Sequence, residues 1–330
     1  MTLLSVENLS VTLKTVRGPA RAVRNLSFDL EKGKTLGIVG ESGCGKSLTA
    51  LAIMGLLPEN GWADGRVTLG GENLLDYSED QMCHVRGDRI GMVFQEPMTS
   101  LNPLHTVGKQ IAEAMILHRG MNRGEARAEV IRLLDLVGIP EPAKRVGSYP
   151  HQLSGGQRQR VMIAIALSCG PELLIADEPT TALDVTIQKQ ILDLIKNLIE
   201  DLGMAMILIS HNLAVISQNV QDVIVMYGGT RVESGPTNAV FSDLSHPYSQ
   251  GLFSAVPQID DTKASRRRLT TIPGTVPELA DLPAGCTFQE RCTYVTDACR
   301  PTPPPVVQVG EGHNVACLHI EAARTAWGAR

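Results

Sequence analysis

The stretch Gly40–Ser47, with the sequence GESGCGKS, follows the apolar run Leu36–Val39 and matches the pattern of a phosphate-binding loop. Glycines let backbone N–H groups surround phosphate oxygens, and the helix that follows points its positive N-terminus at the same anions. A glycine-rich turn is the alternative, but residues 48–54 contain helix formers and no proline. We therefore predict nucleotide binding, with Lys46 on the phosphates and Ser47 on Mg²⁺. The candidate nucleotide-binding residues of the loop are Gly40, Ser42, Gly43, Cys44, Gly45, Lys46, Ser47 and Leu48.

The composition excludes several classes of protein. A chain of 330 residues that is 43% hydrophobic can form one large domain and an accessory domain. Its net charge of -5 argues against a broad basic surface, so we expect no nucleic-acid partner. The longest apolar run, Val161–Cys169, is shorter than the roughly 18 residues that span a bilayer, and the N-terminus lacks a signal-peptide pattern. We expect a cytosolic protein whose Cys44, Cys83 and Cys169 are packing or loop residues.

The pattern of apolar residues predicts mixed secondary structure. Strand pairs are predicted at Leu3–Val11 with Ala22–Leu30, and at Arg66–Leu69 with Arg89–Phe94. Residues 107–137 have apolar residues at helical spacing and predict a helical insert.

A second glycine-containing motif, LSGGQ, begins at Leu153 and precedes an apolar helical stretch. A serine before two glycines at a helix start is commonly an N-cap. The alternative is a second anion site, in which Ser154 and the bare backbone of Gly155 and Gly156 approach a phosphate closely. The motif alone leaves both readings open.

Two further strands end in polar residues. The buried strand Leu173–Ala176 is followed by Asp177 and Glu178, which we expect to point to opposite faces, one toward Mg²⁺ and the other toward an attacking water. A solvated acidic pair is the alternative. The strand Ala205–Ser210 ends in His211, at the edge where α/β sheets place ligands.

In this order and spacing, these elements resemble the ATP-binding subunit of ABC transporters over residues 1 to about 250. The resemblance implies a role for each motif. Gln95 would contact Mg²⁺ and sense a membrane subunit, and Asp177 would be a Mg²⁺ ligand. Glu178, His211 and Lys46 would be catalytic, with Glu178 as the general base. Residues of the partner's ATP site would be Ser154, Gly155, Gly156 and Gln157, and Ala182–Asp184 would form the D-loop with Asp184 at the nucleotide.

The sequence around the motifs narrows the resemblance to one group of ABC transporter subunits. The stretches Phe94–Pro103 and Ala176–Gln188, and the sequence His246–Tyr248, are similar to those of dipeptide and oligopeptide importer ATPases. Nickel and glutathione importers share these sequences, so the sequence does not identify the transported substrate. No aromatic residue precedes Phe28, and Leu13 or Val16 is expected where the family stacks adenine on an aromatic ring.

The composition changes after Pro257, which predicts a domain at 1–257 and another at 258–330. The run Arg266–Arg268 is expected to be a solvated linker rather than a nucleic-acid or lipid contact. Four cysteines lie beyond it: Cys286, Cys292, Cys299 and Cys317. A segment so poor in apolar residues needs a bound metal or cross-link to stabilise its fold. The cysteine spacing does not distinguish between zinc and an iron–sulfur cluster. The family resemblance favours a [4Fe-4S] cluster, with His313 and His319 as spare ligands.

The resemblance implies an α/β fold: a P-loop ABC-type nucleotide-binding domain with an antiparallel β subdomain and a helical subdomain, plus a small Cys-rich C-terminal domain. Two such ATPase subunits, identical or related, would sandwich two ATPs head to tail. Two transmembrane permease subunits and an extracytoplasmic peptide-binding protein would complete the importer, with this chain at the cytoplasmic face of the membrane. The alternatives are a soluble ABC ATPase of DNA repair or translation and a catalytically idle subunit. The absence of a long heptad run and the presence of Lys46, Glu178 and His211 argue against them.

Overall fold

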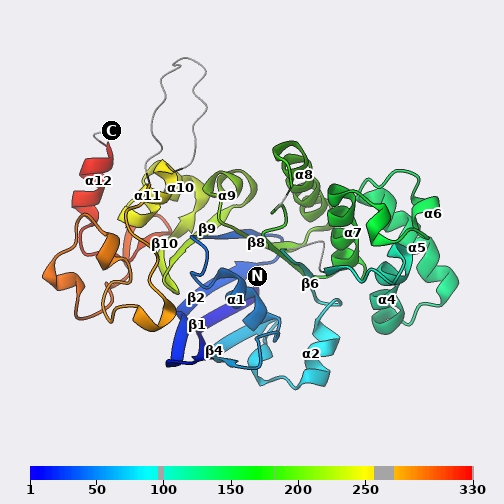
Figure 1. The fold of residues 1–330 in the computed structure, drawn as a ribbon, viewed down its shortest axis with the longest axis horizontal. Helices are drawn as coiled ribbons and strands as arrows, with labels where there is room; N and C mark the ends of the chain where they lie inside the picture. The colour runs from blue at the N-terminus through cyan, green and yellow to red at the C-terminus, as the bar shows by residue number, and fades with distance from the viewer. Residues whose placement is uncertain (96–99, 182, 256–270, 329–330) are drawn as a thin grey trace, which may run out of the picture. The chain divides into compact units, whose positions relative to one another are not determined.

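The computed structural model describes residues 1–95, 100–181, 183–255 and 271–328, and the chain forms two compact units (Figure 1). The first unit comprises Met1–Leu4, Leu30–Lys34 and Asp76–Ile209, and the second comprises Ser5–Asp29, Thr35–Leu75 and Ser210–Arg330. Within the described ranges, no helix has the length and apolar character that crossing a membrane requires.

Three parallel strands form the centre of the first unit, in the order β8-β7-β6. They are β6 (Ile90–Val93), β7 (Leu173–Asp177) and β8 (Ala205–Ser210). All five residues of β7 are buried, which explains its continuous apolar run, since a central parallel strand is covered on both faces. The strand predicted at Arg89–Phe94 is confirmed as β6, but its predicted pairing with Arg66–Leu69 is wrong. Its partner is β7, with Ile90 opposite Leu173.

The first unit also contains helices. They are α2 (Glu79–Val85), α4 (Val107–Arg119), α5 (Arg123–Leu136), α6 (Pro142–Arg145), the short 3-10 helix η2 (Pro150–Gln152), α7 (Gly155–Leu167) and α8 (Val185–Leu202). The predicted helical insert at 107–137 is confirmed by α4 and α5, which pack against each other and against α7 (Figure 1). The Thr106 and Asn122 side chains cap the two helices by accepting from backbone N–H groups of their first turns.

The second unit begins with a hairpin. Strand β1 (Thr2–Thr15) and strand β2 (Gly18–Glu31) are connected by a turn at Val16 and Arg17, which confirms the first predicted strand pair. The sheet has the order β2-β1-β4-β5, with β4 (Gly61–Leu69) and β5 (Glu72–Asn73). The 3-10 helix η1 (Leu74–Asp76) follows. This sheet corresponds to the expected antiparallel β subdomain.

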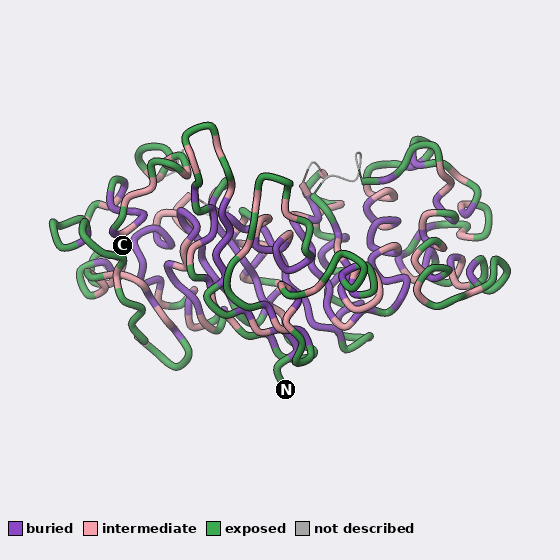
Figure 2. The backbone as a smooth tube through the Cα atoms, turned by 90° about the horizontal axis from the view of Figure 1, so that it is seen from below, coloured by how far each residue is buried: buried purple, intermediate pink, exposed green. Residues whose placement is uncertain are grey.

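The part of the larger sheet that belongs to this unit has the order β11-β12-β10-β9-β3. Its strands are β3 (Thr35–Val39), β9 (Asp222–Tyr227), β10 (Thr230–Pro236), β11 (Val307–Gly310) and β12 (His313–Val315). Strands β3 and β9 are parallel, whereas β10 is antiparallel to both β9 and β12. The strands β3 and β9 are buried along most of their length. Figure 2 draws the buried parts of the backbone in purple. The C-terminal segment therefore extends a sheet that begins with the strand before the phosphate loop.

The remaining helices of the second unit are α1 (Lys46–Ile53), α9 (Leu213–Asn219), α10 (Thr237–Ser242), α11 (Pro247–Ser254) and α12 (Ile320–Gly328), with 3-10 turns η3 (Leu279–Asp281), η4 (Gln289–Arg291) and η5 (Asp297–Cys299). Helix α12 packs on α11, because Gln250 Nε2 donates to the Ala323 carbonyl at 3.0 Å and Trp327 contacts Phe253 edge-on.

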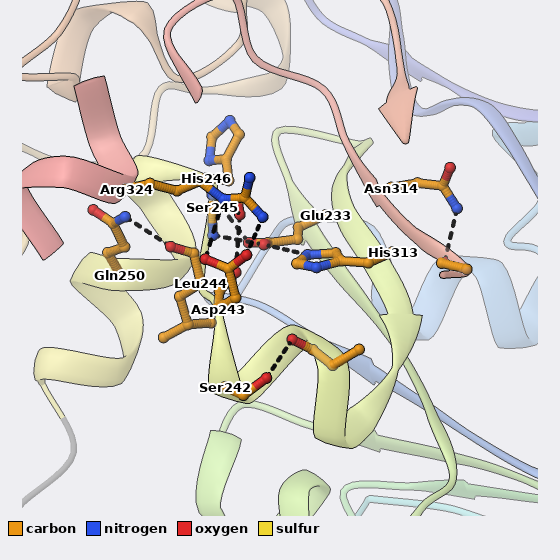
Figure 3. Close-up of polar contacts among 12 residues, drawn as sticks. Glu233, Ser242, Asp243, Leu244, Ser245, His246, Gln250, His313, Asn314 and Arg324 are labelled. Carbon is orange, nitrogen blue, oxygen red and sulfur yellow. Dashed lines mark hydrogen bonds and ion pairs between the residues drawn. The ribbon is translucent and has the colours of Figure 1, made fainter. Parts of the chain in front are cut away.

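A buried carboxylate ties the C-terminal segment to this unit (Figure 3). Glu233 of β10 is fully buried and accepts hydrogen bonds from the backbone N–H groups of Ser245 and His246, at 2.8 and 3.2 Å. His313 Nε2 of β12 lies 2.8 Å from the same carboxylate. Nearby, Arg324 of α12 forms an ion pair with Asp243. Since an unpaired buried carboxylate is costly, these partners fix β10, β12 and the loop before α11 together.

Candidate functional site

The phosphate loop connects β3 to α1 within the second unit. Gly45, the residue before α1, has a φ of 98°, and a Cβ there would lie 2.6 Å from the Ala22 carbonyl oxygen. A Cβ on Gly40 would lie 2.2 Å from the Met226 carbonyl oxygen. Both positions therefore require glycine. The pattern read from the sequence reflects the space available to the backbone.

Lys46 is the first residue of α1, and only 5% of it is exposed. Its Nζ donates to the carbonyl oxygens of Gly40 and Glu41, at 2.9 and 3.1 Å. The ammonium thus lies over the loop whose N–H groups and helix N-terminus favour anions. Ser42 and Gly43 are exposed at the loop, and Ser47 is half-buried. Burial raises the pKa of the Cys44 thiol, so Cys44 packs as a neutral side chain.

The acidic pair lies at the end of β7, in the first unit. Asp177 is the last residue of the strand and is buried. Glu178 has left the strand, with a φ of 45°, and its N–H donates to the Ile209 carbonyl at 2.9 Å. The expectation that the two carboxylates alternate along one strand is therefore wrong, because a left-handed residue ends the alternation. A strained residue of this kind is typical of functional sites.

Two side chains position the Glu178 carboxylate. Gln95 Nε2 donates to Glu178 Oε2 at 3.2 Å, and Thr181 Oγ1 donates to the same oxygen at 2.9 Å. Gln95 follows β6 and Glu178 follows β7, so neighbouring parallel strands bring these residues together. The carboxyl ends of such strands are where ligands bind in α/β sheets.

The LSGGQ motif forms the start of α7. Ser154 caps the helix by accepting from Gln157 N–H at 3.3 Å, and the Gln157 side chain accepts from Ser154 N–H at 3.1 Å. The N-cap reading is therefore right in geometry. Ser154 and Gly155 are nevertheless exposed, and a Cβ on Gly155 would make only an ordinary contact of 3.5 Å with Leu183. The cap leaves the first turn open at the surface.

The remaining predicted residues lie at element ends. Asp184 caps α8, with its Oδ1 accepting from Ile187 N–H at 2.9 Å, and His211 is exposed directly after β8. Ala182 of the predicted D-loop, part of Phe94–Pro103 and the run Arg266–Arg268 lie outside the described residues. Val16, one of two candidates for the adenine contact, is fully exposed, and Leu13 is half-buried.

The four C-terminal cysteines are free thiols. In the described parts of the chain, no group of three or more His, Cys, Asp or Glu side chains is arranged to hold a metal ion, so the expected cluster is not confirmed. His313, expected as a spare ligand, is buried against Glu233, and His319 Nε2 lies 2.9 Å from Thr296 Oγ1.

The same thiols nevertheless influence one another. Burial, together with the neighbouring cysteine charges, raises the pKa of Cys292 to about 11 and that of Cys317 to about 11. Backbone N–H groups of Tyr294 and His319 donate to these two sulfurs, at 3.4 and 3.3 Å. Backbone N–H donors of this kind also surround the sulfurs of thiolate-ligated groups.

Sequence reasoning missed the residues that hold the phosphate loop from outside. Tyr248 OH accepts from Glu41 N–H at 2.8 Å, and Arg291 forms an ion pair with the Glu41 carboxylate. The sequence His246–Tyr248 indicates the family resemblance but does not predict a contact with the phosphate loop. Nothing local marks Arg291, because its partner lies 250 residues away in the chain.

Two family models match the chain. Residues 23–181 match the ABC transporter family, and residues 232–299 match the C-terminal region of oligopeptide/dipeptide transporters. The second match covers three of the four C-terminal cysteines and ends at Cys299.

Several named proteins are similar to this chain along nearly its full length. A putative peptide import ATP-binding protein of Brucella ovis is 48% identical over 96% of both chains. The oligopeptide transport ATP-binding protein OppD of Escherichia coli is 49% identical over 96% of this chain and 93% of its own. The oligopeptide transport ATP-binding protein OppD of Salmonella typhimurium is 50% identical over 92% of this chain and 89% of its own.

Solved structures confirm the α/β P-loop fold. The ATP-binding cassette MJ0796, solved as a dimer in a post-hydrolysis state with ADP and Pi, is 30% identical, with a TM-score of 0.64 over 71% of this chain and 99% of its own. CbiO1 from Clostridium perfringens, part of an ABC transporter complex, is 27% identical, with a TM-score of 0.62. The match covers 74% of this chain and 92% of CbiO1. Neither likeness covers more than 74% of this chain.

Proposed function

The chain belongs to the ATP-binding subunits of ABC peptide importers, and on this premise we propose how its residues bind and hydrolyse ATP. Its function is to hydrolyse ATP as a subunit of a peptide or oligopeptide importer. The nickel, glutathione and soluble-ATPase alternatives are not favoured, since the relatives at 48–50% identity are peptide-import proteins.

Lys46 and the N–H groups of the loop 40–47 bind the β and γ phosphates of ATP. The observation that supports this role is the loop itself: glycines where a Cβ would clash, and a buried lysine over the helix N-terminus. Ser47, Asp177 and Gln95 serve as ligands of the Mg²⁺ that accompanies ATP. His211 orients the γ-phosphate.

Glu178 is the general base that takes a proton from the attacking water. Its carboxylate is oriented by Gln95 and Thr181, which supports this assignment. Because Gln95 follows an adjoining strand, movement of the segment after β6 would change the orientation of the base. This offers a route by which a membrane subunit controls hydrolysis.

The importer assembles from two ATPase subunits, two transmembrane permeases and an extracytoplasmic peptide-binding protein, with this chain at the cytoplasmic face of the membrane. Ser154, Gly155, Gly156 and Gln157, with Asp184, complete the ATP site of the second ATPase subunit. The open first turn of α7 supports this role, because a phosphate can approach its N–H groups.

Reconstitution tests the function directly. The chain is purified with the permease subunits of its importer, placed in vesicles with the binding protein, and supplied with ATP. We expect uptake of labelled di- or oligopeptides that is lost with Lys46→Ala. Uptake of nickel or glutathione with no peptide uptake would overturn the peptide assignment.

We further propose that residues 258–330 carry a [4Fe-4S] cluster on Cys286, Cys292, Cys299 and Cys317, with zinc as the alternative. The backbone N–H groups that donate to the sulfurs of Cys292 and Cys317 support this proposal. The cluster would stabilise the fold of a segment that has only a small hydrophobic core. Anaerobically purified protein should contain about four irons and four sulfides per chain, whereas about one zinc would identify the alternative. Cys292→Ser should lower the metal content.

A further inference from the structure

Arg291 comes from the cysteine-containing segment, but its side chain extends to the phosphate loop. Its Nη1 lies 2.7 Å from Glu41 Oε2 and its Nη2 lies 3.2 Å from Glu41 Oε1, which makes a two-pronged ion pair. The Arg291 side chain is only 5% exposed. Both residues belong to the second unit. A paired, buried guanidinium of this kind is geometrically specific.

Other contacts fix the guanidinium in this position. Its Nε donates to the Pro273 carbonyl at 2.9 Å, and Nη1 also donates to Tyr227 OH at 3.3 Å. The Arg291 guanidinium carbon lies 5.6 Å from the centre of the Tyr227 ring, within the range of a cation–π contact. Phe288, three residues earlier, packs edge-on against the same tyrosine. Arg291 therefore acts from a rigid support.

Every polar group of Glu41 is engaged. Its carboxylate pairs with Arg291, its N–H donates to Tyr248 OH at 2.8 Å, and its carbonyl accepts from Lys46 Nζ at 3.1 Å. One residue of the loop thus connects the C-terminal segment with the lysine that binds phosphates.

The charge of Glu41 is unfavourable for a loop that binds anions. An unneutralised carboxylate beside the phosphates of ATP would repel them, and the repulsion is strong where water is partly excluded. A guanidinium that pairs with both oxygens neutralises the charge and holds it away from the loop's N–H groups.

We propose that Arg291 is a positioning residue for ATP: it neutralises and orients Glu41, so that the C-terminal segment sets the affinity of the phosphate loop. This inference rests on the proposal that residues 40–47 bind the phosphates. It assigns to the C-terminal segment an effect on nucleotide binding that acts through a side chain.

The test measures binding of a fluorescent ATP analogue to the full chain. Arg291→Gln should raise the Kd about tenfold, because it leaves the Glu41 carboxylate unpaired. Arg291→Lys, which keeps the charge, should raise it by less. The second change Glu41→Gln, made in the Arg291→Gln chain, should restore the Kd to within about threefold of the parent, because the repelling charge is gone. Arg300→Gln, which removes an exposed arginine of the same segment, is the control.

Rescue distinguishes the proposal from a merely structural role. If Arg291→Gln binds ATP like the parent, or if Glu41→Gln fails to restore binding, the proposal is wrong. If Arg291→Gln does not fold, the double variant decides: a folded chain with near-parental Kd supports the proposal, and any other result overturns it. In the assembled ATPase, Arg291→Gln should raise KM for ATP while kcat stays within about twofold.

One further variant separates this inference from the proposed site. Lys46→Ala should abolish binding of the same analogue. If it binds like the parent, the assignment of the loop as the ATP site is wrong. If Lys46→Ala loses binding while Arg291→Gln keeps it, only the role of Arg291 is wrong.

Discussion

The side-chain amide of Gln95 donates a hydrogen bond to the Glu178 carboxylate at 3.2 Å, although 83 residues separate the two in the sequence. Parallel pairing of β6 with β7 brings them together. Thr181 supplies a second donor to the same oxygen, so the carboxylate is held by two neutral groups. A carboxylate fixed in this way is oriented for the role of general base that we propose for Glu178.

Replacing Glu178 by Gln should leave ATP binding intact and lower turnover by about 10² or more, because the amide cannot accept the proton of the attacking water. Steady-state phosphate release from the assembled importer at saturating ATP measures the effect. Glu129→Gln, in an exposed ion pair with Arg132 on α5, is the matched control. Parental turnover in Glu178→Gln would show that another group activates water.

Replacing Gly155 by Asp should prevent ATP-driven dimerisation. The new carboxylate would lie against the γ-phosphate of the ATP bound to the second ATPase subunit, and the repulsion would cost roughly several kcal/mol. Light scattering with ATP, in the Glu178→Gln background, follows the dimer. Gly155→Ala separates charge from size: the added Cβ would make only an ordinary contact with Leu183, so this variant should still dimerise. Dimerisation of the Asp variant would remove the role assigned to the motif.

Acidification should destabilise the second unit through His246. Burial lowers the pKa of His246 to about 4, from an ordinary value of 6.5, although the Glu233 charge opposes the shift. Between these two values the unfolded chain takes up a proton that the folded chain does not, so the free energy of unfolding falls as the pH falls. The loss between about pH 7.5 and about pH 5 should be about 2 kcal/mol.

Denaturant titrations at the two pH values measure this loss. His246 Nδ1 accepts from Tyr248 N–H at the start of α11, and His246→Asn keeps an acceptor there without a titrating ring. The variant should lose less stability on acidification than the parent does. Equal losses in the two chains would mean that other groups carry the effect.

Replacing Glu233 by Gln should loosen the C-terminal segment. The amide offers only one oxygen to the three donors that the carboxylate serves, and the expected loss is about 3 kcal/mol. Limited proteolysis should then cleave the segment after residue 271 sooner than in the parent. Glu321→Gln, on the exposed face of α12, should not change the rate. Unchanged cleavage in Glu233→Gln would show that other contacts hold the segment.

The sequence allows prediction of features that depend on a few neighbouring residues. Gly45 and Lys46 can be recognised because the backbone of a phosphate loop requires particular residues within one short stretch of sequence. Strand β7 can be recognised because a central parallel strand is continuously apolar. Strand alternation does not predict the left-handed backbone of Glu178, because the strand ends at Asp177. Arg291 and Glu233 could not be found, because their partners come from distant parts of the chain. The cysteine ligation was expected from family resemblance alone, and it stays a prediction.

The pairing of β12 with β10 has a consequence for biosynthesis. The sheet that contains β3, formed from residues 35–39, acquires its strands β11 and β12 only from residues 307–315. Until the ribosome has delivered these residues, β10 presents an open edge of backbone N–H and C=O groups, which is a template for pairing with other chains. Long-range closure of this kind is also slow. The nascent subunit is thus exposed to edge pairing from the time β10 has emerged until residues 307–315 follow it, and the C-terminal segment ends that exposure.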